Sequence, residues 1–376
     1  MKGYEGSPAI SPIQLVLLVF GTVVGVGFLT LPRVVIEKAR EDAWLTVILA
    51  GALLLVALWL VLRAARLFPE DTLIEYNVKV FGRVAGFVIN LMFGVYLLFF
   101  TITGVRTMAE VVRAEMLPFT PTEAIIFGML LTLLYAAWDG LMTIVRINES
   151  GQPITFLLMM FFFLFAYLEA DWSELRVPFT NGLLPIIQPL PNTAYSYVGF
   201  EILFLYYPFV VKKDKSFRHA AAGIALAGGF YGFIVLGTLV TLGADVAIAQ
   251  VYPVVTMAKV IEVVRQFVER AELLLLVLWL PLAFTTHLVT FYSTAFSLHR
   301  MVPVISFRIW MGLLVPVIYF LSQIPDNLIV MAKWSDRVGQ AGMVFLFGYP
   351  LLLFAGVFVR RMLGLHPPPG KEGEPK

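Results

Sequence analysis

Long apolar runs, separated by short clusters of charge, glycine and proline, dominate the pattern of this chain. A helix that crosses a bilayer needs about 20 mostly apolar residues. Ten windows approach or exceed that length, at about residues 13–35, 43–66, 82–113, 121–138, 141–168, 193–211, 219–243, 264–298, 302–323 and 338–361. The pattern therefore predicts an all-α polytopic membrane protein with ten transmembrane helices.

The composition agrees with a protein solvated by lipid. Of the 376 residues, 60% are hydrophobic and 14% are charged, which is too little polar surface to cover a water-soluble globule. A net charge of +2 excludes the broad basic field of a nucleic-acid-binding protein. The chain has no cysteine and only four scattered histidines, so we expect neither a metal site nor a cofactor. No catalytic pattern of paired carboxylates or of serine with histidine is present, and we expect no enzyme.

The distribution of charge predicts how the chain crosses the membrane. The loop Lys212-Lys213-Asp214-Lys215 is basic, whereas the loop from Glu169 to Glu174 is acidic. Since lysine and arginine favour the cytoplasmic side, both termini are expected there, with no cleaved leader. Residues 1–363 are expected to form a single transmembrane domain, and residues 364–376, rich in proline, glycine and charge, a disordered cytoplasmic tail.

Ten spans divide into two sets of five, at about residues 11–168 and 193–361, and an odd number per half inverts the second half. In the first span, Gly25 and Gly27 lie near the middle and Pro32 near the end. In the sixth span, Gly199 is followed by Pro208. Because glycine and proline weaken a helix, both spans are predicted to be broken at mid-membrane. The alternative for the glycines is close packing of helices, with Gly21 and Gly25 on one small-residue face.

Several motifs carry a family resemblance. The run from Ile10 to Arg33 resembles the opening of the spore germination permease family, the B subunits of nutrient germinant receptors. Phe68 to Tyr76, Gly199-Phe200-Glu201, and Phe267 to Glu272 with Trp279 resemble later parts of that family, in the same order. The family is similar to the amino acid, polyamine and organocation transporters, which share a five-plus-five inverted repeat with broken first and sixth helices.

The resemblance implies a receptor subunit in the inner spore membrane, or the cell membrane, that works with an A and a C subunit. It would bind a small nutrient, most often an amino acid, and trigger germination through ion release. The alternative is a proton- or sodium-coupled amino acid transporter of the same fold. Since one fold serves both functions, architecture alone does not decide between them.

An amino acid needs amide donors for its carboxylate, acceptors for its ammonium group and an apolar wall. Amides freed near Gly25 suit the carboxylate, and carbonyls around Tyr197 suit the ammonium group. The predicted ligand-binding residues are Val24, Gly25, Val26, Gly27, Phe28, Tyr96, Tyr197, Val198, Gly199, Phe200, Glu201, Phe284 and Thr285.

Ionisable residues within the spans raise further alternatives. Glu201 is expected to be functional, because a charge inside a span is costly, but a structural carboxyl held by a neighbouring span remains open. The pair Thr285-Thr286 could hold sodium against carbonyls of the first span, although hydroxyls in membrane helices more often bond their own backbone. His287 carries less weight. Arg106, Glu110, Arg113 and Glu115 are interpreted as a solvated helix end in which Arg106 and Glu110 can pair, with an external gate as the alternative.

Overall fold

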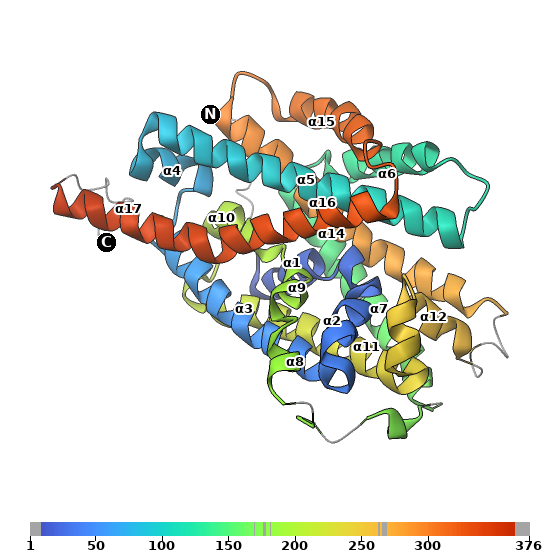
Figure 1. The fold of residues 1–376 in the computed structure, drawn as a ribbon. Helices are drawn as coiled ribbons and strands as arrows, with labels where there is room; N and C mark the ends of the chain where they lie inside the picture. Colours follow the sequence, from blue (N-terminus) through green and yellow to red (C-terminus); the bar gives the residue numbers. More distant parts are fainter. Residues whose placement is uncertain are drawn as a thin grey trace.

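A computed structural model describes residues 9–168, 170–175, 178–180, 182–261, 264 and 269–364. In this part of the chain every regular element is a helix, and the single β-bridge joins Ile10 to Val210 (Figure 1). Nearly all of the predicted tail lies outside the described residues, as do Phe267 and Val268 of the motif before the eighth span.

The helices follow one another through the whole described chain. Their order is α1 (Pro12–Val23), η1 (Val26–Leu29), α2 (Leu31–Ala39), η2 (Arg40–Asp42), α3 (Ala43–Arg66), α4 (Leu73–Phe81), α5 (Arg83–Glu115), α6 (Thr122–Ala137), α7 (Leu141–Leu168), η3 (Trp172–Glu174), α8 (Leu184–Ile187), α9 (Leu190–Tyr195), η4 (Phe200–Ile202), α10 (Leu203–Tyr206), η5 (Tyr207–Phe209), η6 (Lys213–Lys215), α11 (Ser216–Ala249), α12 (Pro253–Val260), α14 (Ala271–Met301), α15 (Phe307–Ser322), α16 (Leu328–Met343), η7 (Val344–Gly348) and α17 (Tyr349–Met362).

Six helical segments are long and apolar enough to cross a membrane. They are Leu31–Arg66, Arg83–Glu115, Leu141–Leu168, Lys213–Ala249, Ala271–Met301 and Leu328–Met362. Four shorter apolar helices accompany them, at Pro12–Val23, Thr122–Ala137, Phe200–Phe209 and Phe307–Ser322. The prediction of a helical, polytopic membrane protein is confirmed, while the division into ten spans and two inverted halves stays a prediction.

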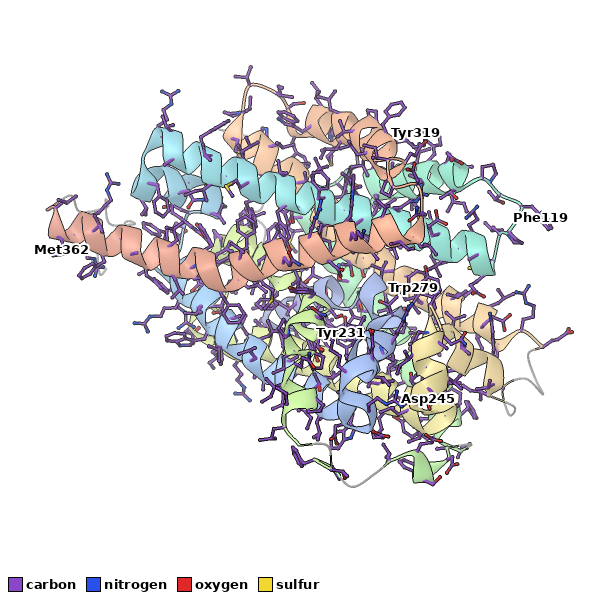
Figure 2. The ribbon with its side chains drawn as sticks, in the orientation of Figure 1. Phe119, Tyr231, Asp245, Trp279, Tyr319 and Met362 are labelled. Atoms are coloured by element: carbon purple, nitrogen blue, oxygen red, sulfur yellow. The ribbon has the colours of Figure 1, made fainter. Side chains whose placement is uncertain are left out.

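The core lies where helices from the first part of the chain, α1, α3 and α5, pack against α11 and α14 from its later part. Helix α14 packs along α5, and α11 packs against both α1 and α3. Helices α16 and α17, joined by the π-turn η7, form one long rod across the front of the molecule in Figure 1. Figure 2 shows Tyr231 deep among these helices, whereas Phe119 and Met362 project at opposite ends. Aromatic side chains therefore fill the interior as well as the surface.

The start of α1 is defined by its own sequence and by a distant loop. Ser11 and Gln14 form a capping box, in which each side chain accepts from the other residue's amide. Just before it, the Ile10 amide donates to Phe209 at 2.8 Å, and the Val211 amide donates to Ile10 at 3.1 Å. The chain before α1 is thus tied to the end of η5.

Ion pairs also join distant parts of the chain. Lys213 lies 2.7 Å from Glu70, and Arg300 lies 3.0 Å from Glu75. Helix α3 begins beside Asp42 and ends at Arg66, which donates a hydrogen bond to Ser216, just after the basic loop at Lys212 to Lys215. The two ends of α3 therefore lie at opposite faces of the molecule. The predicted basic loop and the carboxylate of Asp42, which accepts from the Phe179 amide, therefore lie at opposite faces.

The interpretation as a solvated helix end is wrong for Arg106 and Glu110, whereas the Arg113 side chain is 49% exposed. The side chains of Arg106 and Glu110 are only 12% and 11% exposed and form a 2.7 Å ion pair. Arg106 also donates to the carbonyls of Ser322 and Pro325, at 3.3 and 3.4 Å. The pair therefore fastens α5 to the connection between α15 and α16. A sequence shows the spacing of charges on a helix but not the loop that covers them.

Candidate functional site

The first helix is interrupted where the sequence places its glycines. Helix α1 ends at Val23, and Val24 is extended, with φ −83° and ψ 94°. Gly25 has φ −127° and ψ −134°, so it is also outside the helical region. The chain then makes the short helix η1 and enters α2 with Pro32 in its first turn. The predicted break is present, and its two non-helical residues are Val24 and Gly25.

The second interruption lies between α9 and α10. Helix α9 ends at Tyr195, and Gly199 has φ 138°, a backbone conformation that favours glycine. A Cβ on Gly199 would overlap the carbonyl oxygen of Thr22 in α1. The two breaks are therefore pressed together, and a residue without a side chain is needed at their contact.

Side chains from the rest of the protein bond the carbonyls at the end of α1. The Thr286 hydroxyl donates to Gly21 at 2.7 Å and lies 3.1 Å from the Val24 carbonyl oxygen. Within the described chain, the Tyr231 hydroxyl contacts the Val23 carbonyl at 2.9 Å, and the Trp279 indole N–H donates to that of Gly25 at 3.4 Å. Side chains of α11 and α14 thus already bond the carbonyls of Gly21, Val23, Val24 and Gly25.

The same break borders a cavity. The first amides of a helical segment have no partner inside their own helix, and Gly25, Val26 and Gly27 line a cavity of about 320 Å³. That volume falls at the lower end of ordinary ligand pockets. Since the carbonyls are bonded and the amides begin a helix, this wall suits a group that accepts hydrogen bonds, such as a carboxylate.

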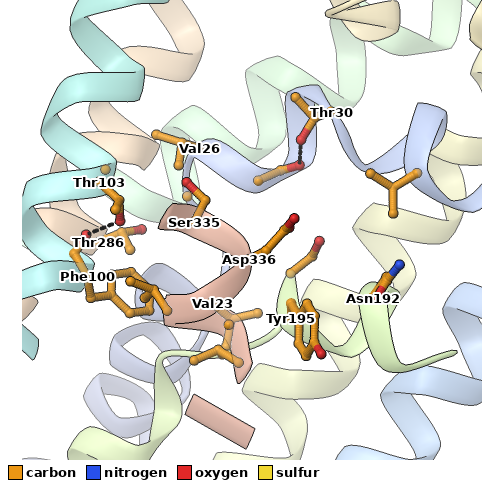
Figure 3. Close-up of a pocket in the computed structure, with 18 of the residues that line it drawn as sticks. Val23, Val26, Thr30, Phe100, Thr103, Asn192, Tyr195, Thr286, Ser335 and Asp336 are labelled. Carbon is orange, nitrogen blue, oxygen red and sulfur yellow. Dashed lines mark hydrogen bonds between the residues drawn. The ribbon is translucent and has the colours of Figure 1, made fainter. Parts of the chain in front are cut away.

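Residues from many elements enclose this cavity, as Figure 3 shows. Its buried part includes Val23, Gly25, Gly104, Val198, Thr286 and His287, and its exposed rim includes Glu37, Lys38, Asn192, Ser335 and Asp336. The rim lies toward the end of α2, beside the residues that precede α3. The cavity therefore opens toward the Asp42 face and away from the face that holds the basic loop.

Four of the predicted ligand-binding residues line the cavity: Gly25, Val26, Gly27 and Val198. The other nine do not line it: Val24, Phe28, Tyr96, Tyr197, Gly199, Phe200, Glu201, Phe284 and Thr285. Among them, the Tyr197 hydroxyl donates to Val47 at 3.0 Å, and the Thr285 hydroxyl lies 2.5 Å from the Gln152 side-chain nitrogen, which donates to it. Phe284 borders a separate apolar groove between α5, α6 and α14. A direct contact of these nine with ligand stays a prediction.

Glu201 supports the break rather than the cavity wall. It is fully buried, and the Tyr96 hydroxyl donates to one of its oxygens at 2.6 Å. The Gly199 amide donates to its other oxygen at 2.8 Å. This is the pairing with a freed backbone amide that a broken helix makes possible. The carboxyl group thereby joins α5 to the second break.

The two explanations for the glycines of α1 both hold, at different residues. A Cβ on Gly21 would overlap the side chain of Asn148 and press on Gln152 in α7, so this glycine permits close helix packing. A Cβ on Gly25 would lie 3.0–3.3 Å from Thr286, at the break itself. Gly21, within α1, thus permits close packing, whereas Gly25, two residues beyond the end of α1, lies in the interruption.

Sequence reasoning missed part of the cavity. His287, at the floor, received little weight, and Asn192, Ser335 and Asp336, at the rim, none. Asp336 lies just outside the tenth predicted span, which begins at about residue 338, so its charge gave no signal of a site in the sequence. Within the described residues, no group of three or more histidine and acidic side chains is placed to hold a metal ion.

Comparison with known proteins identifies the family of this chain. The family model described as "Spore germination protein" matches residues 9–329. Spore germination protein YndE of Bacillus subtilis (strain 168) is 28% identical, over 93% of this chain and 96% of its own length. Spore germination protein A2 of the same organism is 27% identical, over 94% and 97%. The resemblance found in the sequence is confirmed.

Solved transporters share the fold. A nucleobase–cation symport family transporter, MHP1, aligns with a TM-score of 0.66 at 13% identity, covering 95% of this chain and 80% of its own. MhsT, solved in complex with L-phenylalanine, aligns with a TM-score of 0.60 at 14% identity, covering 94% and 99%. Their likeness shows a transporter-type architecture. With the match over residues 9–329, the chain belongs to the spore germination protein family.

Proposed function

We propose that this chain is the membrane-embedded B subunit of a germinant receptor and that it binds a small nutrient, an amino acid, in the cavity between the two breaks. The observation that carries the proposal is the pairing of a cavity of about 320 Å³ with helix-starting amides at Gly25 to Gly27. The carboxylate of the ligand would accept from these amides. Of the thirteen residues predicted from the sequence, Gly25, Val26, Gly27 and Val198 would form this site, and the others, apart from Phe284 in its separate groove, would support it.

The proposed setting follows from the family. The chain would lie in the inner spore membrane as ten spans in two inverted halves, with both termini on the cytoplasmic side. An A and a C subunit would read its conformation, and ligand binding would shift the balance between two states. In that orientation the cavity opens away from the cytoplasm, so a nutrient from outside can reach it.

A thermal stability screen tests the proposal. The purified full chain in lipid nanodiscs is heated with each common amino acid, because a ligand at a hundred times its dissociation constant stabilises a protein by about 2.7 kcal/mol. At least one amino acid is expected to raise the unfolding temperature. A flat profile across the whole set would contradict the proposal of an amino acid ligand.

The second candidate function is secondary transport of the same ligand. It is favoured by the fold shared with MHP1 and MhsT, and by a cavity that opens toward the Asp42 face. Liposomes that contain the chain alone distinguish the two functions. Concentrative uptake of the labelled amino acid would favour transport, whereas binding without uptake would favour the receptor.

A further inference from the structure

His287 is a buried residue of the cavity lining whose side chain forms no hydrogen bond in the described structure. It lies on α14, is 1% exposed and lines the cavity. Neither ring nitrogen has a hydrogen-bond partner in the described structure. Both nitrogens are buried, and buried polar groups in proteins are nearly always paired, so an unpaired imidazole on a residue that lines a cavity points to a partner that enters the cavity.

The other unpartnered polar atoms do not share this position. Within the described chain they belong to Tyr76, Gln152, Ser297 and Gln323, and none of these residues lines the cavity. The threonines beside His287 are also engaged, since Thr286 bonds the carbonyls of α1 and Thr290 donates to the His287 carbonyl at 3.2 Å. The imidazole therefore differs from its neighbours in being free for a ligand.

Helix α5 makes room for the ring. A Cβ on Gly104 would overlap the imidazole, so only glycine leaves this space. Phe100, one turn earlier, lies with its ring centroid 6.3 Å from that of His287. Gly104 and Phe100 both line the cavity as well. The edge of the imidazole that carries both nitrogens therefore packs against Gly104 of α5, a residue that also lines the cavity.

We propose that His287 selects the ligand by bonding a neutral polar group of its side chain, an amide or a hydroxyl. This rests on the proposed function, in which the ligand is an amino acid. Its carboxylate would meet the amides at Gly25 to Gly27, and its side chain would reach His287 across the same cavity. A neutral imidazole presents one donor and one acceptor, and amides and hydroxyls present both as well.

The chemistry predicts which ligands are rejected. A site built to bond a polar group discriminates strongly against an analogue that lacks it, because its own buried group is then left unpaired. Two pairs of amino acids have similar size: asparagine with leucine, and threonine with valine. Only asparagine and threonine carry a neutral polar group in the side chain. The charged rim residues Glu37, Lys38 and Asp336 are exposed, so they are not expected to reverse the preference at the floor.

Calorimetric titration of the full chain in nanodiscs tests the proposal with these two pairs. The polar member of at least one pair is expected to bind about tenfold tighter or more. His287→Gln, which keeps a donor and an acceptor, retains the preference. His287→Leu is expected to bring the affinities for the two members of the pair within about twofold of each other. His299→Leu, on the same helix but outside the cavity, is expected to leave both affinities unchanged.

A second variant covers the case in which His287→Leu fails to fold. Gly104→Ala displaces the ring without changing it and is expected to weaken the same preference. Gly94→Ala, in the same helix with open space around it, is the control. Equal affinity of the wild-type chain for both members of each pair would overturn the selectivity proposal and leave the proposed function intact. Binding of no amino acid at all would overturn both.

Discussion

The hydroxyl oxygen of Tyr231 lies 2.9 Å from the carbonyl oxygen of Val23, the last residue of α1. The same hydroxyl lies 3.0 Å from the carbonyl of Ser196, just after α9. One side chain from α11 thus contacts the backbone at both breaks. The two interruptions are held by the same group, which explains how non-helical backbone persists where lipid offers no hydrogen bonds.

Removing this hydroxyl should loosen both breaks. Tyr231→Phe is expected to lower the free energy of unfolding by about 1–3 kcal/mol, because a buried carbonyl loses its donor. Chemical denaturation in detergent measures the change. Tyr135→Phe is the matched control, since Tyr135 is 83% exposed. A loss of stability no larger than that of the control would show that the hydroxyl does not support the breaks.

Gly199 should tolerate no side chain. Gly199→Ala is expected to destabilise the protein by about 2 kcal/mol or more, because φ 138° is strained for alanine and its Cβ overlaps Thr22. Gly229→Ala, in α11 with open space around it, should be neutral or slightly stabilising. Thermal unfolding compares the two variants. Equal stability would place the native backbone at Gly199 in an ordinary conformation.

Glu201 and Tyr96 should behave as a coupled pair. Glu201→Gln and Tyr96→Phe each remove part of one buried network, so their effects on stability should not add, with a coupling energy of about 0.5–3 kcal/mol. A double-mutant cycle measures it. Additive effects would mean that the hydrogen bond contributes nothing. A loss of ligand affinity with unchanged stability would instead assign Glu201 to the ligand.

Arg106 should anchor the connection between α15 and α16. Arg106→Ala is expected to cost about 1–3 kcal/mol, because it leaves the buried Glu110 with only the exposed Arg113 and frees two carbonyls. Lys213→Ala breaks an ion pair with the more exposed Glu70 and should cost about 1 kcal/mol or less. Limited proteolysis should cut residues 323–327 faster in Arg106→Ala. An unchanged cleavage rate would argue against the anchor.

The sequence was most informative where a helix-weakening or ionisable residue lies inside a predicted membrane span. Glycine and proline at mid-span predict a broken helix, and Gly25 and Gly199 lie at breaks. The carboxylate of Glu201 was singled out for the same reason, and it bonds the amide of Gly199. These residues are informative because lipid makes their cost large, whatever surrounds them.

The rest of the site depends on distant contacts that spacing along the chain does not reveal. Tyr231 and Trp279 are aromatic residues in apolar helices, and their role as donors to the break follows only from how α11 and α14 pack. His287 becomes notable because its nitrogens are unpartnered in the described structure, which no sequence shows. Arg106 and Glu110 have the spacing of a solvated pair, but a loop buries them.

The central claim is that the cavity between the two breaks binds the nutrient. Calorimetric titration of an amino acid found in the stability screen tests it in wild-type, Gly27→Leu and Gly229→Leu chains. Gly27 lines the cavity and has ordinary space for a Cβ, so leucine there should fill the site without unfolding the protein. We expect binding to be lost in Gly27→Leu and kept in Gly229→Leu. Undiminished affinity in a folded Gly27→Leu chain would contradict the account.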